Sequence, residues 1–227
     1  MTARTGHLPA DGVRTMFDRI APVYDAMNHA MTAGLDRRWR RLAVDAVVAP
    51  GDTVLDACCG TGDLALAARS AGGIVTGLDF SRAMLERARR KSTEIEWLEG
   101  DLLRLPFGDG AFDTATVGFG VRNAEDLDLA LRELRRVVKP GGRLAILEIV
   151  RPKGPLALFY KAWFDGLVPL AGKVISGGVA YSYLPASVRR FPGPAELVER
   201  VRAAGFHPVA HRLLGGGIVV LLVGEAR

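Results

Sequence analysis

The sequence predicts an α/β protein with a seven-stranded, mostly parallel, doubly wound sheet of the Rossmann-like type, to which a helical cover is added. Two observations predict it. Short apolar runs alternate with segments of helical periodicity between residues 53 and 149, as expected for parallel strands joined by helices. Two further apolar runs, 209–213 and 217–223, flank Gly215-Gly216 and are expected to close the sheet as a hairpin.

Each element is expected from a local signal. Apolar residues at helical spacing predict helices, and short apolar runs that end in turn residues predict strands. Pro50-Gly51-Asp52 forms a turn before the first strand, Ser81 is suited to cap a helix, and Lys139-Pro140-Gly141-Gly142 stops another. The expected strands before the hairpin are 53–57, 73–78, 95–99, 112–117 and 143–149, and the expected helices are 13–25, 37–48, 63–70, 82–91, 124–138 and 194–204.

Composition indicates a globular chain with a sizeable core. Of the 227 residues, 49% are hydrophobic, and the formal net charge is +5. The arginine-rich runs 37–41 and 87–91 are expected to be ordinary solvated helix faces. A surface for anionic lipid or for nucleic acid is the alternative interpretation of these runs.

The cysteines, the histidines and the N-terminal residues favour a cytoplasmic protein without a structural metal. Cys58 and Cys59 are adjacent, so no disulfide framework is expected. The four histidines lack the spacing of metal ligands, so no metal site is expected either. No apolar leader or charge-free apolar run of membrane-spanning length is found, which predicts a chain that does not cross the membrane.

A glycine turn after the first strand predicts a cofactor site. Gly60 and Gly62 fit the start of a dinucleotide fingerprint, but Ala65 stands where its third glycine would fall. Asp56 closes the strand and Asp63 opens the helix, and carboxylates there would repel a pyrophosphate. They suit a cofactor without phosphate and with a cationic amino-acid tail, which favours S-adenosylmethionine over NAD. Taken alone, Asp63 is an ordinary acid at a helix N-terminus.

An acid at the end of the next strand supports the same interpretation. Asp79 follows the apolar run 73–78, one βα unit after the glycine turn. Because a carboxylate in this position accepts hydrogen bonds from two ribose hydroxyls, it indicates a cofactor that contains a nucleoside.

Four motifs carry a resemblance to a known family. They are Tyr24-Asp25-Ala26-Met27-Asn28, Phe119-Gly120-Val121-Arg122-Asn123, the run 136–142 with Glu148, and Tyr181-x-Tyr183-Leu184-Pro185. With them the chain resembles the class I S-adenosylmethionine-dependent methyltransferases. More narrowly, it is similar to the menaquinone and ubiquinone C-methyltransferases, which methylate the ring of a polyprenyl quinol. The resemblance runs from about residue 16 to residue 223, and it departs from the family pattern at Thr32, Asp36, Gly118 and Val150.

The resemblance implies a domain organisation. Residues 1–50 would form an N-terminal helical cap and residues 51–150 the S-adenosylmethionine-binding core. Residues 151–192 would form a helical substrate cover, and residues 193–227 a helix and β-hairpin that complete the core sheet.

The resemblance also implies which residues bind the cofactor. The turn around Thr61 would hold the methionine end, Asp79 the ribose, and Asp101 with Leu102 the adenine. For Asp101, a loop-capping role is the alternative. The full set of expected cofactor-binding residues is Asp56, Gly60, Thr61, Gly62, Asp79, Asp101, Leu102 and Gly118.

The expected acceptor is the reduced quinol, because ionisation of a ring hydroxyl makes the adjacent ring carbon a nucleophile. Arg122 is the candidate to stabilise the phenolate, and Tyr24, Asp25 and Asn28 are candidates to orient or deprotonate the hydroxyl. Two structural alternatives remain. Tyr24 could be a packing aromatic, and Arg122 could form a salt bridge to Asp25 or Glu148.

The expected reaction is C-methylation of a prenylated hydroquinone, demethylmenaquinol to menaquinol, in respiratory quinone biosynthesis. A benzoquinol of ubiquinone biosynthesis, another small phenol or an amine, and a non-catalytic cofactor-binding assembly subunit are the alternatives. A nucleic-acid partner is not expected, because Gly118-Phe119-Gly120-Val121 stands where base-modifying enzymes carry an Asn/Asp-Pro-Pro-aromatic run.

The sequence leaves open whether the segment 151–192 contacts the membrane. Its apolar side chains could line a channel for the prenyl tail, and its basic side chains could meet lipid headgroups at the inner face of the membrane. An ordinary helix packed on the sheet is the alternative, and a homodimer is also left open. The residues concerned are Leu158, Phe159, Lys161, Trp163, Phe164, Leu167, Val168, Arg189 and Arg190.

Overall fold

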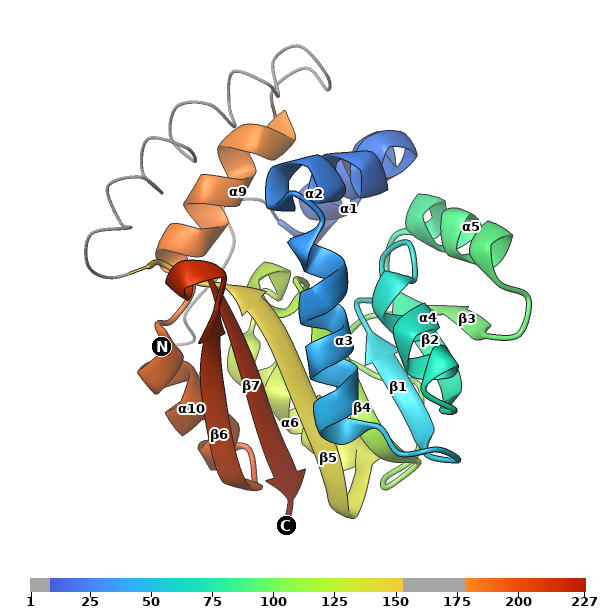
Figure 1. Ribbon diagram of the computed structural model, residues 1–227, viewed down its shortest axis with the longest axis vertical. Helices are drawn as coiled ribbons and strands as arrows, with labels where there is room; N and C mark the ends of the chain where they lie inside the picture. The colour runs from blue at the N-terminus through green and yellow to red at the C-terminus, as the bar shows by residue number, and fades with distance from the viewer. Residues whose placement is uncertain (1–8, 153–178) are drawn as a thin grey trace.

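The computed structural model describes residues 9–152 and 179–227, which form a three-layer α/β structure (Figure 1). Its central sheet has seven strands in the order β3-β2-β1-β4-β5-β7-β6. The strands β1 to β5 run parallel to one another, and β7 pairs antiparallel with both β5 and β6. The predicted fold class is therefore confirmed.

The elements follow one another as the sequence predicts, with a few changes at their ends. The strands are β1 (Thr53–Ala57), β2 (Ile74–Asp79), β3 (Glu96–Glu99), β4 (Phe112–Gly118), β5 (Val138–Ile149), β6 (Phe206–Leu214) and β7 (Val219–Ala226). The helices are α1 (Ala10–Ile20), α2 (Tyr24–Thr32), α3 (Leu35–Val47), α4 (Asp63–Ser70), α5 (Arg82–Lys91), α6 (Leu127–Val137), α9 (Val179–Arg190) and α10 (Pro194–Ala203).

Helices cover both faces of the sheet, and each face has its own buried core. On one face α6 and α10 pack their leucines and valines against the strands. On the other face α3, α4 and α5 do the same. Burial on both faces agrees with β1 and β4, most of whose residues are buried.

The N-terminal region differs from the prediction of one helix over 13–25. The helix α1 ends at Ile20, a 3-10 turn follows at Ala21–Val23, and the separate helix α2 begins at Tyr24. Pro22 explains the break, because proline has no backbone N–H to donate and its ring restricts the preceding residue. As a consequence, Tyr24 and Asp25 lie in the first turn of a new helix.

Other boundaries also differ, among them those of the hairpin strands predicted at 209–213 and 217–223. Two of the differences have a clear cause. The helix α6 begins at Leu127 and not at 124, because the Asp126 side chain caps it by accepting a hydrogen bond from the Leu129 amide at 2.9 Å. The strand β5 begins at Val138, because Val138 already pairs with Phe112 before the register shift that leads to Arg143. The glycine-rich run 139–142 therefore lies inside this strand as an irregularity and not before it.

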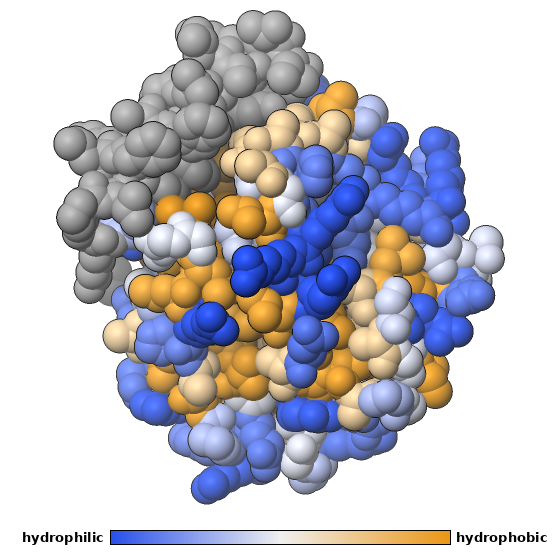
Figure 2. All heavy atoms as spheres, in the orientation of Figure 1, coloured by the Kyte–Doolittle hydropathy of each residue, from blue (hydrophilic) through white to orange (hydrophobic). Residues whose placement is uncertain are grey.

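The arginine-rich run at 37–41 lies on α3, and most of it is solvated. Arg37, Arg38 and Arg41 are exposed, and Figure 2 shows hydrophilic side chains across the middle of the viewed face. Arg40 differs from them because it is buried and pairs with Asp36 at 2.5 Å. A solvated helix face thus describes three of these four arginines.

Most of the predicted substrate cover lies outside the described residues. This holds for Leu158, Phe159, Lys161, Trp163, Phe164, Leu167 and Val168. Among the helices within 9–152 and 179–227, none is long and apolar enough to cross a membrane. The same residues contain no cluster of three or more His, Cys, Asp or Glu side chains that could hold a metal ion.

Candidate active site

The glycine turn lies at the carboxyl edge of the sheet, where β1 and β2 end side by side. Gly60 has a φ of +56° and donates its amide hydrogen to Oδ2 of Asp79 at 2.8 Å. The Cys59 amide donates to the Leu78 carbonyl at 3.0 Å. Because the neighbouring strands are parallel, the turn after one strand and the acid at the end of the next meet, as the sequence predicts.

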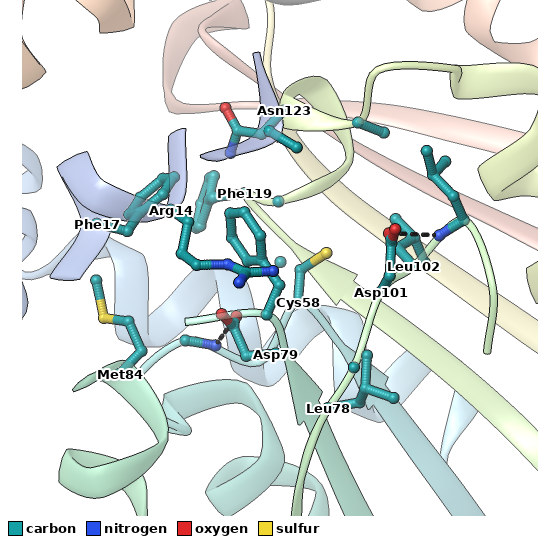
Figure 3. A pocket seen from close by; sticks show the side chains of 18 of the residues that line it. Arg14, Phe17, Cys58, Leu78, Asp79, Met84, Asp101, Leu102, Phe119 and Asn123 are labelled. Atoms are coloured by element: carbon teal, nitrogen blue, oxygen red, sulfur yellow. Dashed lines mark hydrogen bonds between the residues drawn. The ribbon is translucent and has the colours of Figure 1, made fainter. Parts of the chain in front are cut away.

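Asp79 is buried and held by the backbone on both sides. Its Oδ1 accepts a hydrogen bond from the Ser81 amide at 2.9 Å, in addition to the bond from Gly60. Burial raises the pKa of Asp79 to about 6, and the two backbone hydrogen bonds only partly offset this effect. The carboxylate is thus oriented before a ligand arrives, and it lines the pocket of Figure 3.

Asp56 is a buried carboxylate with an oxygen atom that lacks a partner. Its Oδ1 accepts a hydrogen bond from the Thr116 hydroxyl at 2.9 Å, whereas no described residue bonds to Oδ2. Burial raises its pKa to about 7, although Thr116, the charge of Arg40 and the backbone of Ala65 favour the charged form. Asp56 lines a hollow together with Gly60, Thr61 and Tyr24. A ligand with a cationic ammonium group would supply the missing partner.

The two glycines of the turn serve different purposes. A Cβ on Gly60 would meet no atom within 4 Å, and Gly60 lines the hollow. A Cβ on Gly62 would lie 2.5 Å from the Trp97 ring. Gly62 is therefore required for packing of the turn against β3, and it is Gly60 that lets a ligand approach the backbone.

We expect alanine at Gly62 to act mainly on stability and alanine at Gly60 to act mainly on cofactor binding. Gly62→Ala should lower the free energy of unfolding by about 2–4 kcal/mol, because a φ of +88° strains an L-residue and Trp97 must move. Gly60→Ala should cost only about 1–2 kcal/mol of strain but should fill space that the ligand needs. Urea unfolding and titration with S-adenosylhomocysteine measure both effects. A Gly62→Ala variant of full stability would contradict the packing argument.

A pocket beside Asp79 is suited to a nucleoside. Leu78, Phe80, Asp101 and Leu102 line it from the sheet edge. The helix α1 closes it from above with Arg14 and Phe17, two residues that the sequence did not single out (Figure 3). Asp101 also accepts a hydrogen bond from the Leu103 amide at 2.9 Å, so it caps its loop and lines the pocket at once.

A second, mostly apolar pocket adjoins the first. Phe17, Tyr24 and Phe119 line both pockets, so that a ligand in one would lie next to a ligand in the other. Phe119 adopts a φ of +60°, which is uncommon for a residue with a side chain. The other residues of this second pocket, called the acceptor pocket below, are Met16, Ile20, Met27, Asn28, Met31, Asp36, Arg40, Arg122, Ile149, Tyr183 and Leu184.

Arg122 lines the acceptor pocket and is paired with Glu148. It lies in the 3-10 turn Val121–Asn123 directly after β4, and its Nη1 donates to Glu148 Oε1 at 2.7 Å and to the Phe119 carbonyl. Burial is the largest single influence and disfavours the charged guanidinium, but the charge and hydrogen bond of Glu148, together with Tyr24 and Tyr183, outweigh it and raise the pKa of Arg122. Of the two salt-bridge partners that the sequence left open, the structure has Glu148 and not Asp25.

The three candidate residues of α2 point in two directions. Tyr24 and Asn28 line the acceptor pocket. Asp25 does not; it accepts a hydrogen bond from the Thr61 hydroxyl at 2.5 Å and pairs with Lys91 at 2.7 Å. A residue that the sequence did not assign to the site, Tyr183 of α9, is near Arg122 and donates its hydroxyl to Asn123 at 3.1 Å.

The fold and the two joined pockets define a class of protein. A glycine turn, an oriented acid at the end of β2 and an orphaned carboxylate oxygen form a site for a nucleoside with a cationic amino-acid tail. The seven-stranded sheet with an antiparallel β7 is that of the Rossmann-like methyltransferases. A SAM-dependent methyltransferase from Thermotoga maritima superposes with a TM-score of 0.68 at 22% identity, over 94% of this chain and 99% of that one.

The chain belongs to the ubiE/COQ5 methyltransferase family, whose model matches residues 5–225. It is 47% identical to a demethylmenaquinone methyltransferase of Thermus thermophilus, over 92% of this chain and 99% of the relative. It is also 44% identical to a 2-phytyl-1,4-naphthoquinone methyltransferase of Synechococcus elongatus, over 96% and 99%. S-adenosylmethionine is therefore the cofactor, and the residues around Asp56 and Asp79 fit it.

We expect Asp56→Asn to stabilise the protein at alkaline pH while weakening cofactor binding. A pKa of about 7 in place of 3.8 corresponds to a cost of about 4 kcal/mol for the charged form. The pKa of Asp56 is higher in the folded state than in the unfolded state. The Asp56 carboxyl therefore contributes to stability below pH 4, and this contribution is lost as the pH rises through 7. The unpaired asparagine amide costs about 1–3 kcal/mol, which leaves a gain of about 2 kcal/mol at pH 8. Urea unfolding at pH 8 and pH 5 measures it; an equal gain at both pH values would contradict the ionisation argument.

Proposed function

We propose that this chain transfers a methyl group to a ring carbon of a prenylated hydroquinone and that the acceptor is demethylmenaquinol. Two relatives above 40% identity are named for this kind of acceptor, a demethylmenaquinone and a 2-phytyl-1,4-naphthoquinone. Both names describe naphthoquinones, which favours a naphthoquinol over the benzoquinol of ubiquinone biosynthesis.

The observation that carries the proposal is the acceptor pocket beside the cofactor pocket. Its walls are largely apolar, with Met16, Met27 and Met31 among them, so they suit a fused aromatic ring. Polar groups enter it from Arg122, Tyr24 and Asn28. The ion pair of Asp36 and Arg40 also lines it. An apolar cavity with a few polar groups is typical of a site that orients a mainly hydrophobic ligand.

The residues of this chain contribute positioning and electrostatics. When bound, S-adenosylmethionine supplies an electrophilic methyl group. The Phe119 and Tyr24 rings, which line both pockets, hold the quinol ring toward that methyl group. Arg122 stabilises the phenolate that develops on the ring, since its charge is retained even in a buried site.

Tyr24 and Asn28 orient the ring hydroxyl whose proton must leave. Both lie one turn apart on the same face of α2, so they can contact one hydroxyl group or a water molecule bound to it. Asp25 has no part in this step, because its carboxylate is bonded to Thr61 and Lys91.

Contact with the membrane is the second part of the proposal. A polyprenyl tail is held in the bilayer, so the enzyme meets its acceptor at a lipid surface without needing a span of its own. Co-sedimentation with vesicles of anionic lipid, with and without the prenylated quinone, measures this contact. A protein that stays in the supernatant in both cases would contradict it.

A labelling experiment tests the reaction. Purified protein with methyl-labelled S-adenosylmethionine is given reduced demethylmenaquinone that carries a single prenyl unit, the same compound left oxidised, or a reduced benzoquinone analogue. We expect label in the reduced naphthoquinol and none in the oxidised form. Label in the benzoquinol alone would contradict the naphthoquinol acceptor, and label in none of them would contradict the quinol assignment.

A further inference from the structure

The helix α2 carries part of the acceptor pocket without being anchored by a core of its own. None of its nine residues is fully buried, whereas α1 and α3 on either side each bury several side chains. Tyr24 and Asn28 nevertheless have to be held in a fixed orientation toward the pocket. Tyr24 packs partly against Phe17 and the cluster around Ile20, and polar contacts outside the helix add to this in fixing its position.

Asp25 makes such contacts, and they lead to the cofactor turn. Its Oδ1 accepts a hydrogen bond from the Thr61 hydroxyl at 2.5 Å, and its Oδ2 lies 2.7 Å from Lys91 Nζ at the end of α5. The same Lys91 nitrogen is 2.6 Å from Asp63, the first residue of α4. Asp25 thus joins α2 to the glycine turn and to the ends of two helices of the core.

The contact with Thr61 is the buried part of this network. Thr61 is 2% exposed and lines the hollow with Asp56 and Gly60, where the amino-acid tail of the cofactor fits. The Asp25 carboxylate is 34% exposed and Lys91 27%, so their ion pair is partly solvated and contributes little by itself. A ligand that orders Thr61 would therefore act on α2 mainly through the hydroxyl–carboxylate hydrogen bond.

We propose that Asp25 is a positioning residue that couples the two pockets: cofactor in the hollow fixes Thr61, Thr61 fixes Asp25, and Asp25 fixes the helix that presents Tyr24 and Asn28 to the acceptor. For the identity of the acceptor, this inference rests on the proposed function. Since coupling between two sites is reciprocal, acceptor binding tightens cofactor binding by the same factor.

Four variants distinguish a loss of this coupling from a general loss of protein stability. Asp25→Ala removes both contacts, and Thr61→Val removes the same hydrogen bond without altering α2. Lys91→Met removes the ion pairs to Asp25 and Asp63 but keeps the hydrogen bond between Thr61 and Asp25. Asp128→Asn is the matched control, because Asp128 is also a part-exposed aspartate in an ion pair, 2.9 Å from Arg200, and lines neither pocket.

Hydrogen exchange of residues 24–32 tests the coupling without any acceptor. In the wild type, in Lys91→Met and in Asp128→Asn, saturating S-adenosylhomocysteine should slow exchange of this segment about tenfold. In Asp25→Ala and Thr61→Val it should leave the exchange unchanged, with each variant saturated according to its own measured affinity. Unchanged exchange in the wild type, or equal protection in the two broken variants, would overturn the inference.

A binding titration tests the same coupling at the acceptor. The affinity for oxidised single-prenyl demethylmenaquinone, which is not methylated, is measured with and without S-adenosylhomocysteine. We expect a gain of about tenfold in the wild type and none in Asp25→Ala or Thr61→Val. A gain that survives in both variants would overturn the inference. A quinone that fails to bind even the loaded wild type contradicts the proposed function instead, and the exchange experiment then still decides the role of Asp25.

Discussion

Replacing Arg122 by methionine is expected to lower kcat by about 10²–10³-fold and to destabilise the fold by about 3–5 kcal/mol. The first effect follows from the loss of the cation beside the developing phenolate. The second follows because Glu148 is fully buried and would keep a charge without its partner. Single-turnover methylation of the reduced naphthoquinol and urea unfolding measure the two effects separately.

A double variant distinguishes catalysis from folding at this position. In Arg122→Met with Glu148→Gln the buried charge is gone, so much of the stability should return. The rate should stay low, because no cation has been restored to the acceptor pocket. If the double variant regains both stability and rate, Arg122 acts only through the structure, and its role at the phenolate is wrong.

Replacing Asp79 by asparagine is expected to weaken cofactor binding by about 100-fold. The carboxylate is oriented by the Gly60 and Ser81 amides, and hydrogen bonds from ribose hydroxyls to a charged acceptor contribute about 1.5–3 kcal/mol each. Titration with S-adenosylhomocysteine measures the loss. Asp101→Asn is the matched control at the same pocket, with a smaller expected loss because Asp101 is exposed.

The same variant has a pH signature. Since the pKa of Asp79 is raised to about 6, the wild-type carboxylate becomes protonated below that pH. Affinity of the wild type should then fall about tenfold for each further pH unit, because the neutral acid is a poor acceptor for the ribose hydroxyls. Asp79→Asn should lack this part of the pH dependence. An Asp79→Asn profile that parallels the wild type would assign the titration to another group, with Asp56 as the first candidate.

Most of the fold could be predicted from sequence because its signals are local. Apolar runs and turn residues gave every strand, including the antiparallel pair β6 and β7. One of the boundaries that were predicted wrongly depends on a distant partner, because Val138 is a strand residue only through its pairing with Phe112. The break at Pro22 and the cap at Asp126 are local features, and the helical periodicity was extended across them.

The candidate site also has residues that could be placed from sequence and residues that could not. Gly60 and Asp79 could be brought together from sequence, since the carboxyl ends of neighbouring parallel strands meet at one edge. The closure of the pocket by Arg14 and Phe17 could not, because it depends on how α1 lies over that edge. From sequence, Tyr183 is only part of a motif. The position of α9 in the fold is what brings it near Arg122.

The sequence by itself determined the fold class, the cofactor turn and the family, because these rest on periodicity and on residues close together in the chain. Only the tertiary structure decided the partners of the charged residues. Arg122 pairs with Glu148, 26 residues away, and Asp25 bonds to Thr61, 36 residues away and outside the acceptor pocket. The physical reason for Arg122 is that a buried charge requires a partner. For both residues, the packing of the elements determines which partner lies within reach.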